Sequence, residues 1–91
     1  MKKITLTEFW NSKYAMAIHC NTRQKAKKLL KAFDKLGKVW SGGYSYLNNF
    51  GEYEIYHQYT CYTNDGHYCS DEWYNDHGYT IYEFDEVDLD N

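Results

Sequence analysis

The sequence contains no proline, and no apolar run in it approaches the roughly 20 residues that a membrane-spanning helix needs. Cysteine is scarce: three cysteines cannot all pair within one chain, which favours a reducing compartment. The first residues, 1–5, lead into polar sequence without the apolar core of a signal peptide. We therefore expect a cytoplasmic protein that acts away from membranes.

The length of 91 residues fits one domain, residues 1–91, and leaves no room for two. Hydrophobic residues make up 43% of the chain and aromatic residues 20%, which disfavours disorder. The mean hydropathy of -0.85 does not contradict this, because tyrosine scores as polar while its ring buries a large area. At the two ends we expect residues 1–4 and 85–91 to fray.

Basic residues are absent from the whole second half of the chain. Residues 1–39 hold all 10 lysines and arginines and two acids, a net charge of +8. Residues 40–91 hold 11 acids and no lysine or arginine, and the whole chain has a net charge of -3. Such segregation indicates either two opposed charged faces or internal neutralisation.

In the first half, local signals predict two helices and a strand. Thr5 and Glu8 have the spacing of a capping box, which predicts a helix over 6–12. The apolar run 14–20 predicts a central strand, and the 3.6-residue periodicity that follows predicts the main helix, over 22–36. The apolar stripe of that helix consists of Ala26, Leu29, Leu30, Phe33 and Leu36.

In the second half, turn signals separate short strands. Asn64-Asp65-Gly66 predicts a hairpin turn, and Ser70 is expected to cap a helical turn over 71–74 that ends by Gly78. The apolar residues of 44–58 fit neither the two-residue period of a strand nor the 3.6-residue period of a helix. Strands are expected over 38–40, 59–63, 67–69 and 79–84. Together these elements predict an α+β fold with one main helix packed on a mostly antiparallel sheet, with short flanking helical turns.

The residues give little support to catalysis, metal binding or a cofactor. His19 and Cys20 are adjacent in a strand and so point to opposite faces. His57 lies about 13 Å from Cys61 along an extended chain, too far to share an ion. Cys61 faces Cys69 across the predicted hairpin, and whether they ever pair stays open. We expect no enzyme, no metal site and no cofactor.

The acidic half is also rich in tyrosine: ten of the 11 tyrosines fall between Tyr44 and Tyr82. Tyrosine gives a large contact area with few rotatable bonds, and neighbouring carboxylates suit a basic partner. The candidate partner-binding residues are Tyr53, Glu54, Tyr56, Asp65, Asp71, Glu72, Trp73, Tyr74 and Asp76.

Five segments carry a resemblance to known proteins. They are Ala17-Ile18-His19-Cys20-Asn21-Thr22, Ala26-Lys27-Lys28-Leu29-Leu30, Trp40-Ser41-Gly42-Gly43-Tyr44-Ser45-Tyr46, Thr60-Cys61-Tyr62 and Gly78-Tyr79-Thr80-Ile81-Tyr82-Glu83-Phe84. In this order they resemble a family of small accessory proteins encoded by phages and prophages of Gram-positive bacteria, over most of residues 15–87. The resemblance implies no catalytic residues. It implies a role against host defence, for instance as an anti-CRISPR protein.

These observations favour a non-enzymatic inhibitor of a host defence protein, one that blocks the nucleic-acid groove of a CRISPR-type nuclease effector with its acidic face. A second hypothesis is a small-ligand binder that sequesters a nucleotide immune signal in a pocket walled by Trp40, Tyr44 or Tyr46. A third is a nucleic-acid-binding regulator using Lys27, Lys28 and Lys31, which the acidic half disfavours by repulsion. In every case we expect the lysines of helix 22–36 to face solvent, away from Asp71–Asp76.

Overall fold

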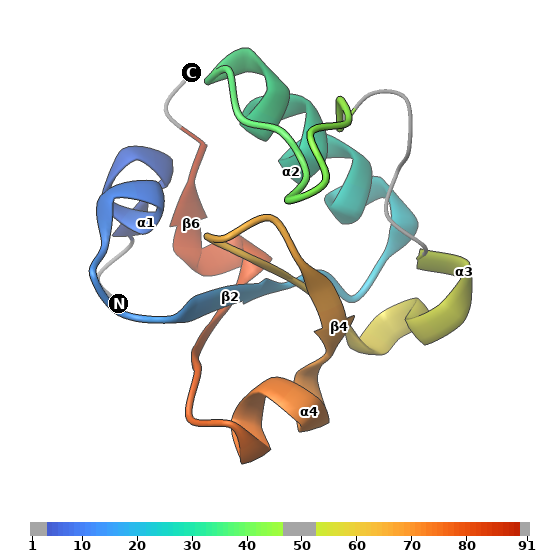
Figure 1. The fold of residues 1–91 in the computed structure, drawn as a ribbon. Helices are drawn as coiled ribbons and strands as arrows, with labels where there is room; N and C mark the ends of the chain where they lie inside the picture. Colours follow the sequence, from blue (N-terminus) through green and yellow to red (C-terminus); the bar gives the residue numbers. More distant parts are fainter. Residues whose placement is uncertain (1–3, 47–52, 90–91) are drawn as a thin grey trace.

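A computed structural model of the protein describes residues 4–46 and 53–89. Within those ranges no helix is long and apolar enough to cross a bilayer. The chain folds into short strands and helices (Figure 1). The elements are β1 (Ile4–Thr5), α1 (Leu6–Asn11), β2 (Met16–His19), α2 (Arg23–Lys35), α3 (Tyr53–Tyr56), η1 (His57–Tyr59), β3 (Thr60–Thr63), β4 (Tyr68–Ser70), α4 (Asp71–Asp76), β5 (Thr80–Glu83), η2 (Phe84–Glu86) and β6 (Val87–Asp88).

The main sheet has four strands in the order β4-β3-β2-β5. β3 pairs antiparallel with both β4 and β2, whereas β5 pairs parallel with β2. The predicted α+β class and the central position of β2 are confirmed. The predicted hairpin is confirmed as well, with Cys61 opposite Cys69 and Gly66 at a positive φ of 84°.

The sheet is covered on both faces, which explains why β2 is apolar on both sides. Ile18 and Tyr62 belong to the larger core, which lies under α1 and α2. Ala17 and Cys61, which point the opposite way, pack with Tyr74 of α4. Figure 1 shows α2 and α4 on opposite sides of the strands.

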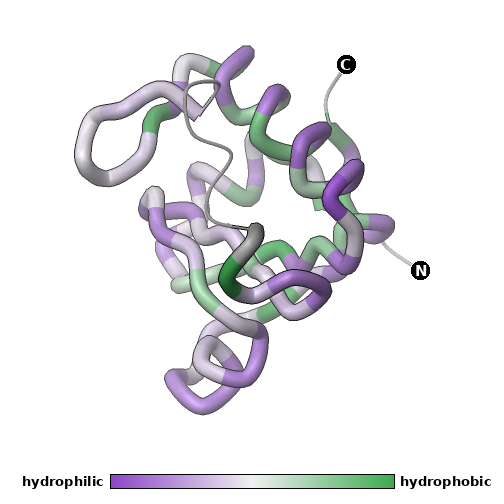
Figure 2. The backbone as a smooth tube through the Cα atoms, turned by 90° about the vertical axis from the view of Figure 1, so that its right-hand side faces the viewer, coloured by the Kyte–Doolittle hydropathy of each residue, from purple (hydrophilic) through white to green (hydrophobic). Residues whose placement is uncertain are grey.

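α2 begins and ends where its sequence predicts. The Thr22 hydroxyl accepts a hydrogen bond from the Lys25 N–H at 3.1 Å, and Gly37 follows the helix. In Figure 2 hydrophobic and hydrophilic stretches alternate along this long helix at the top. The expected burial of Leu36 is wrong: it is 40% exposed, because it caps the helix one residue after the last turn. Ala32 is buried on that face instead.

α1 carries the predicted capping box. The Glu8 N–H donates to the Thr5 hydroxyl, and the Thr5 N–H donates to a Glu8 carboxylate oxygen, both at 3.1 Å. Leu6 and Phe9 are fully buried, and Trp10 is half-buried against Phe33, with ring centroids 4.9 Å apart. The capping box of α1 and the Thr22 cap of α2 thus fix the starts of two helices. Both helices bury their apolar side chains in the same core.

The strand predicted over 38–40 is wrong. This segment forms an isolated bridge between Val39 and Ser45, and the Trp40 N–H donates to the Tyr44 carbonyl at 2.9 Å. The chain reverses at once through Gly43, which has a φ of 88°, so no longer ladder can form. Residues 47–52, inside the segment whose path the sequence left open, lie outside the described residues.

The expectation that residues 1–4 and 85–91 fray is wrong for Ile4 and for residues 85–88. β6 pairs parallel with β1, with Ile4 opposite Val87. Val87 is only 7% exposed in the larger core, and this burial holds the segment in place. Residues 1–3 and 90–91, also expected to fray, lie outside the described part of the chain.

Candidate protein-binding surface

α4 is a six-residue helix fixed at both ends by local chemistry. The Ser70 hydroxyl accepts a hydrogen bond from the Trp73 N–H at 3.3 Å, as its position predicts. Asp71 and Glu72 occupy the first turn, where their charge complements the helix dipole. Gly78 follows the helix at a φ of 78°. The cap therefore presents two carboxylates at the start of an exposed helix.

The two neighbouring aromatic residues of α4 have different roles. Trp73 is 43% exposed and stacks on the His77 ring, with centroids 3.7 Å apart. Tyr74 is 2% exposed and packs with Ala17 and Cys61, so the expectation that it contacts a partner is wrong. Its ring is the apolar anchor that a short helix needs, and burial raises the pKa of its hydroxyl.

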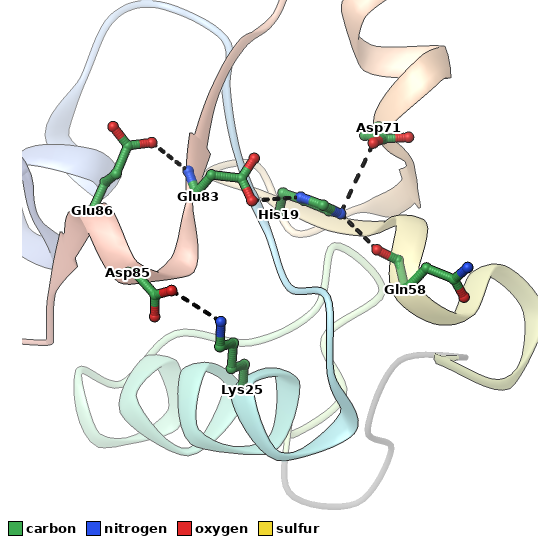
Figure 3. A network of polar contacts seen from close by, with 7 residues as sticks. All are labelled: His19, Lys25, Gln58, Asp71, Glu83, Asp85 and Glu86. Carbon is green, nitrogen blue, oxygen red and sulfur yellow. Dashed lines mark hydrogen bonds and ion pairs between the residues drawn. The ribbon is translucent and has the colours of Figure 1, made fainter.

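Beside α4, His19 connects four elements (Figure 3). Its Nδ1 lies 2.7 Å from a Glu83 carboxylate oxygen on β5, and its Nε2 lies 2.6 Å from the Gln58 carbonyl oxygen on η1. The same Nε2 is 3.9 Å from the Asp71 carboxylate on α4. The imidazole, half-buried on β2, thus ties the acidic end of the sheet together.

The two short contacts hold the His19 ring from opposite sides. The Glu83 carboxylate and the Gln58 carbonyl each face a different ring nitrogen. Which nitrogen donates depends on the tautomer of the ring. The contacts therefore fix the position and orientation of the imidazole between β5 and η1.

Two surface hollows flank the start of α4. One has a volume of about 340 Å³ and lies between α4 and β5. The other, of about 530 Å³, lies between α4 and η1 and is walled partly by Tyr56 and Tyr59. Asp71 and Glu72 line both hollows, so they form a ridge between them. The ridge can enter a groove of a partner while each hollow receives a protruding side chain.

The structure gathers only part of the predicted binding set. Asp71, Glu72, Trp73 and Asp76 lie together on α4, and Glu72 and Asp76 are exposed. Asp65 lies elsewhere, at the hairpin turn, where it accepts a hydrogen bond from the Thr63 hydroxyl.

The other three members of that set belong to α3. Tyr56 is half-buried against the Tyr68 ring, and its pKa is raised, chiefly by a hydrogen bond with the Cys69 side chain. The side chains of Tyr53 and Glu54 lie outside what the structure describes. α3 therefore adds the Tyr56 ring to the wall of the second hollow.

Three residues of this surface were missed from the sequence: His19, Asn75 and Glu83. Asn75 and Glu83 line the hollow between α4 and β5, and the parallel pairing of β2 with β5 places Glu83 opposite His19. Both strands were predicted, but their adjacency was not. Without the pairing, nothing in the sequence relates positions 19 and 83.

The lysines of α2 lie far from this acidic ridge. Lys27, Lys28 and Lys31 are exposed, as expected, and α2 and α4 stand at opposite ends of the molecule in Figures 1 and 2. Lys25 of α2 pairs with Asp85 of η2 at 3.0 Å. The basic helix α2 and the acidic helix α4 therefore lie apart, whereas Asp85 of the acidic half of the sequence lies beside α2.

The two buried thiols offer little reactivity. Burial raises the pKa of the Cys20 and Cys61 thiols, which keeps them protonated and poor nucleophiles. Within residues 4–46 and 53–89, no group of three histidine, cysteine or acidic side chains could hold a metal ion. Cys61 and Cys69 are both free thiols.

The aromatic pocket imagined for a nucleotide does not form from its expected walls. Trp40 and Tyr46 are 8% and 1% exposed and pack on each other, with ring centroids 4.4 Å apart. Tyr44 is exposed at 71%. The first two rings belong to the core, so they cannot stack on a ligand from solvent.

Comparison with known proteins found no match to this chain among family models, curated proteins or solved structures.

Proposed function

We propose that this protein is a non-enzymatic, phage-type inhibitor that binds a host defence protein in the host cytosol. The partner is a nucleic-acid-handling effector, such as a CRISPR nuclease, whose basic groove the α4 surface occupies. Binding there excludes DNA or RNA by occupying the positive charges that hold phosphates.

The observation that supports this proposal is the acidic ridge at the end of the molecule opposite α2. Asp71 and Glu72 stand between two hollows, Glu83 borders one of them, and Trp73 is exposed on the same helix. Carboxylates steer a basic partner, and an exposed tryptophan is a frequent anchor of protein interfaces. The distant position of the α2 lysines leaves the negative potential of the ridge uncancelled.

Charge reversal on α4 and on α2 tests the proposal. The variant Asp71→Lys, Glu72→Lys and Asp76→Lys reverses the acidic ridge, and the matched variant Lys27→Glu, Lys28→Glu and Lys31→Glu reverses the same number of charges on α2. Each protein is used as bait in a host lysate and then in a salt series with the captured effector. We expect the ridge variant to lose binding, chiefly through slower association, and the α2 variant to retain it.

Two results would contradict the proposal. Binding that does not change with salt would remove its electrostatic basis. A protein that shifts nucleic acid directly in a gel, and loses the shift in the α2 variant, would favour the nucleic-acid-binding alternative instead.

A further inference from the structure

The two edges of the main sheet differ in the segments that lie beside them. Beyond β4 other segments approach: the Ser41 N–H donates to the Gly66 carbonyl at the hairpin turn, and the Tyr56 ring packs against Tyr68. β5 is the last strand on the other side. In the part of the chain that the structure describes, no strand pairs with the outer edge of β5.

Ile81 is the residue whose backbone hydrogen-bonding groups lie at the middle of that outer edge. The Thr80 N–H donates to the Ala15 carbonyl at 3.1 Å, so the backbone of Thr80 faces β2. Successive residues of a strand alternate in this direction, so the N–H and C=O of Ile81 point outward. The Glu83 N–H donates to a Glu86 carboxylate oxygen at 2.8 Å, which closes the far end of the edge.

The two faces beside this edge carry hollows of different chemistry. On the α1 face, a hollow of about 500 Å³ is walled by Met16, Tyr82, Ile4 and Tyr14, with Glu8 and Lys13 among its polar lining. On the α4 face, the hollow of about 340 Å³ is lined by Ile81 and by the acids described above, Asp71, Glu72 and Glu83. Tyr82 and Ile81 are adjacent in β5, so the hollows lie on opposite faces of the sheet.

We propose that the outer edge of β5 accepts an extended segment of the partner protein as an added strand, in which basic side chains alternate with apolar ones. Successive side chains of such a strand point to opposite faces. The basic ones reach the acidic hollow while the apolar ones enter the hollow beside Tyr82. This inference rests on the proposed function, because the acidic hollow belongs to the ridge surface.

A second copy of the chain fits this edge less well. Two β5 strands paired about a two-fold axis perpendicular to the sheet keep their α4 faces on the same side. Asp71, Glu72 and Glu83 of one copy then face the same acids of the other, and like charges across a strand pair are destabilising. Charge therefore selects a basic partner strand.

The test uses a capped seven-residue peptide of alternating lysine and leucine, and a control of the same composition with the lysines and leucines in separate blocks. Binding to the full-length protein is followed by NMR of the backbone amides. We expect the alternating peptide to shift the Ile81 amide and to bind at least about tenfold more tightly than the block peptide.

N-methylation of the peptide separates backbone pairing from charge. Methylating the lysine amides blocks an antiparallel added strand, and methylating the leucine amides blocks a parallel one, because only one set faces β5. We expect one methylated set to lower affinity at least about tenfold and the other less than about twofold. Equal effects of the two sets, equal binding of the block peptide, or no binding of the alternating peptide would each overturn strand addition. None of these results decides the proposed function, which the charge-reversal assay with the effector tests by itself.

Discussion

The two faces of the main sheet are covered by helices of very different kinds. α2 has 13 residues and buries an apolar stripe in the larger core. α4 has six residues and buries mainly one ring, that of Tyr74, against Ala17 and Cys61. The first helix is held by extensive burial, whereas the second is held by a cap and a single anchor.

This difference determines where each helix can place charge. A buried leucine or phenylalanine contributes about 1.5–3 kcal/mol, whereas an exposed ion pair contributes roughly 0–1 kcal/mol. Packing therefore orients α2, and its lysines point outward whatever their partners. α4 buries so little of itself that Asp71, Glu72, Trp73 and Asp76 remain available at the surface. A short, weakly buried helix is thus the better platform for recognition, and a long one the better support.

The largest expected effect comes from emptying the core under α2. Phe33 is fully buried and its ring lies 5.3 Å from Tyr46 and 5.9 Å from Phe9, measured between centroids. We expect Phe33→Ala to lower the free energy of unfolding by about 3–5 kcal/mol in urea titration. Leu36→Ala, at the exposed C-cap of the same helix, should cost less than about 1 kcal/mol. Similar losses for the two would show that the packing contrast along α2 is wrong.

The next effect concerns the hairpin turn that supports the 40–46 segment. Gly66 has a φ of 84°, and a Cβ there would lie 2.5 Å from the Ser41 backbone nitrogen. Gly66→Ala should therefore destabilise the protein by about 2–3 kcal/mol through strain and collision together. Gly37→Ala, with a φ of 80° but nothing within 4 Å of its Cβ, isolates the strain and should cost about 1 kcal/mol. Thermal unfolding of both variants checks the difference, and equal losses would mean that the close approach to Ser41 is not needed.

Alkaline pH should lower the free energy of unfolding, because a buried thiol lies on each face of the sheet. Burial raises the pKa of Cys20 on the α2 side and of Cys61 on the α4 side. In the unfolded chain a thiol loses its proton near about pH 8.5, so above that pH the unfolded state binds fewer protons and stability falls. The loss approaches about 1.4 kcal/mol per pH unit for each thiol. Urea titrations from pH 7 to 10 measure it, and Cys61→Ala should reduce the slope; a slope unchanged by that substitution would locate the effect elsewhere.

Local signals predicted most of the fold. The stripe of α2 apart from Leu36, the capping box of Thr5 and Glu8, the Asn64-Asp65-Gly66 turn and the Ser70 cap are all confirmed. Each depends on residues a few positions apart. Interactions between residues a few positions apart can be predicted directly from the sequence. That is why α4, which carries the candidate surface, could be placed before its surroundings were known.

Non-local pairing produced what the sequence could not predict. His19 and Glu83 meet because β5 lies parallel to β2, a choice made by the packing of the whole sheet. Trp73 and Tyr74 are adjacent aromatic residues on a helix too short for a period, so nothing local decided which ring would be buried. The strand predicted at 38–40 failed because the early reversal at Gly43 outweighed the strand preference of the Val39-Trp40 pair.

A smaller expected effect tests whether the contacts of His19 hold η1 and β5 against β2. In His19→Gln one side-chain amide must replace a ring whose two nitrogens contact Glu83 and the Gln58 carbonyl on opposite sides, so it cannot satisfy both contacts. We expect a loss of about 1–2 kcal/mol in unfolding free energy. His67→Gln is the matched control, because His67 is exposed and the contact of its ring with the Ser41 hydroxyl is long, at 3.5 Å. Equal stability of the two variants would mean that the His19 contacts do not hold η1 and β5 together.

The smallest expected effect tests whether ion pairing between the basic and acidic halves of the sequence contributes to stability. Lys25 pairs with Asp85 at 3.0 Å, and the aspartate side chain is 73% exposed, so water screens the pair. We expect Lys25→Gln and Asp85→Asn each to change unfolding free energy by less than about 1 kcal/mol, with a coupling in the double-mutant cycle of about 0.5 kcal/mol or less that fades in 1 M salt. If opposite charges instead held the two halves of the sequence together, the coupling would be several times larger. α2 would then be positioned by charge as well as by packing, and the contrast between an α2 held by burial and an α4 held by a cap would weaken.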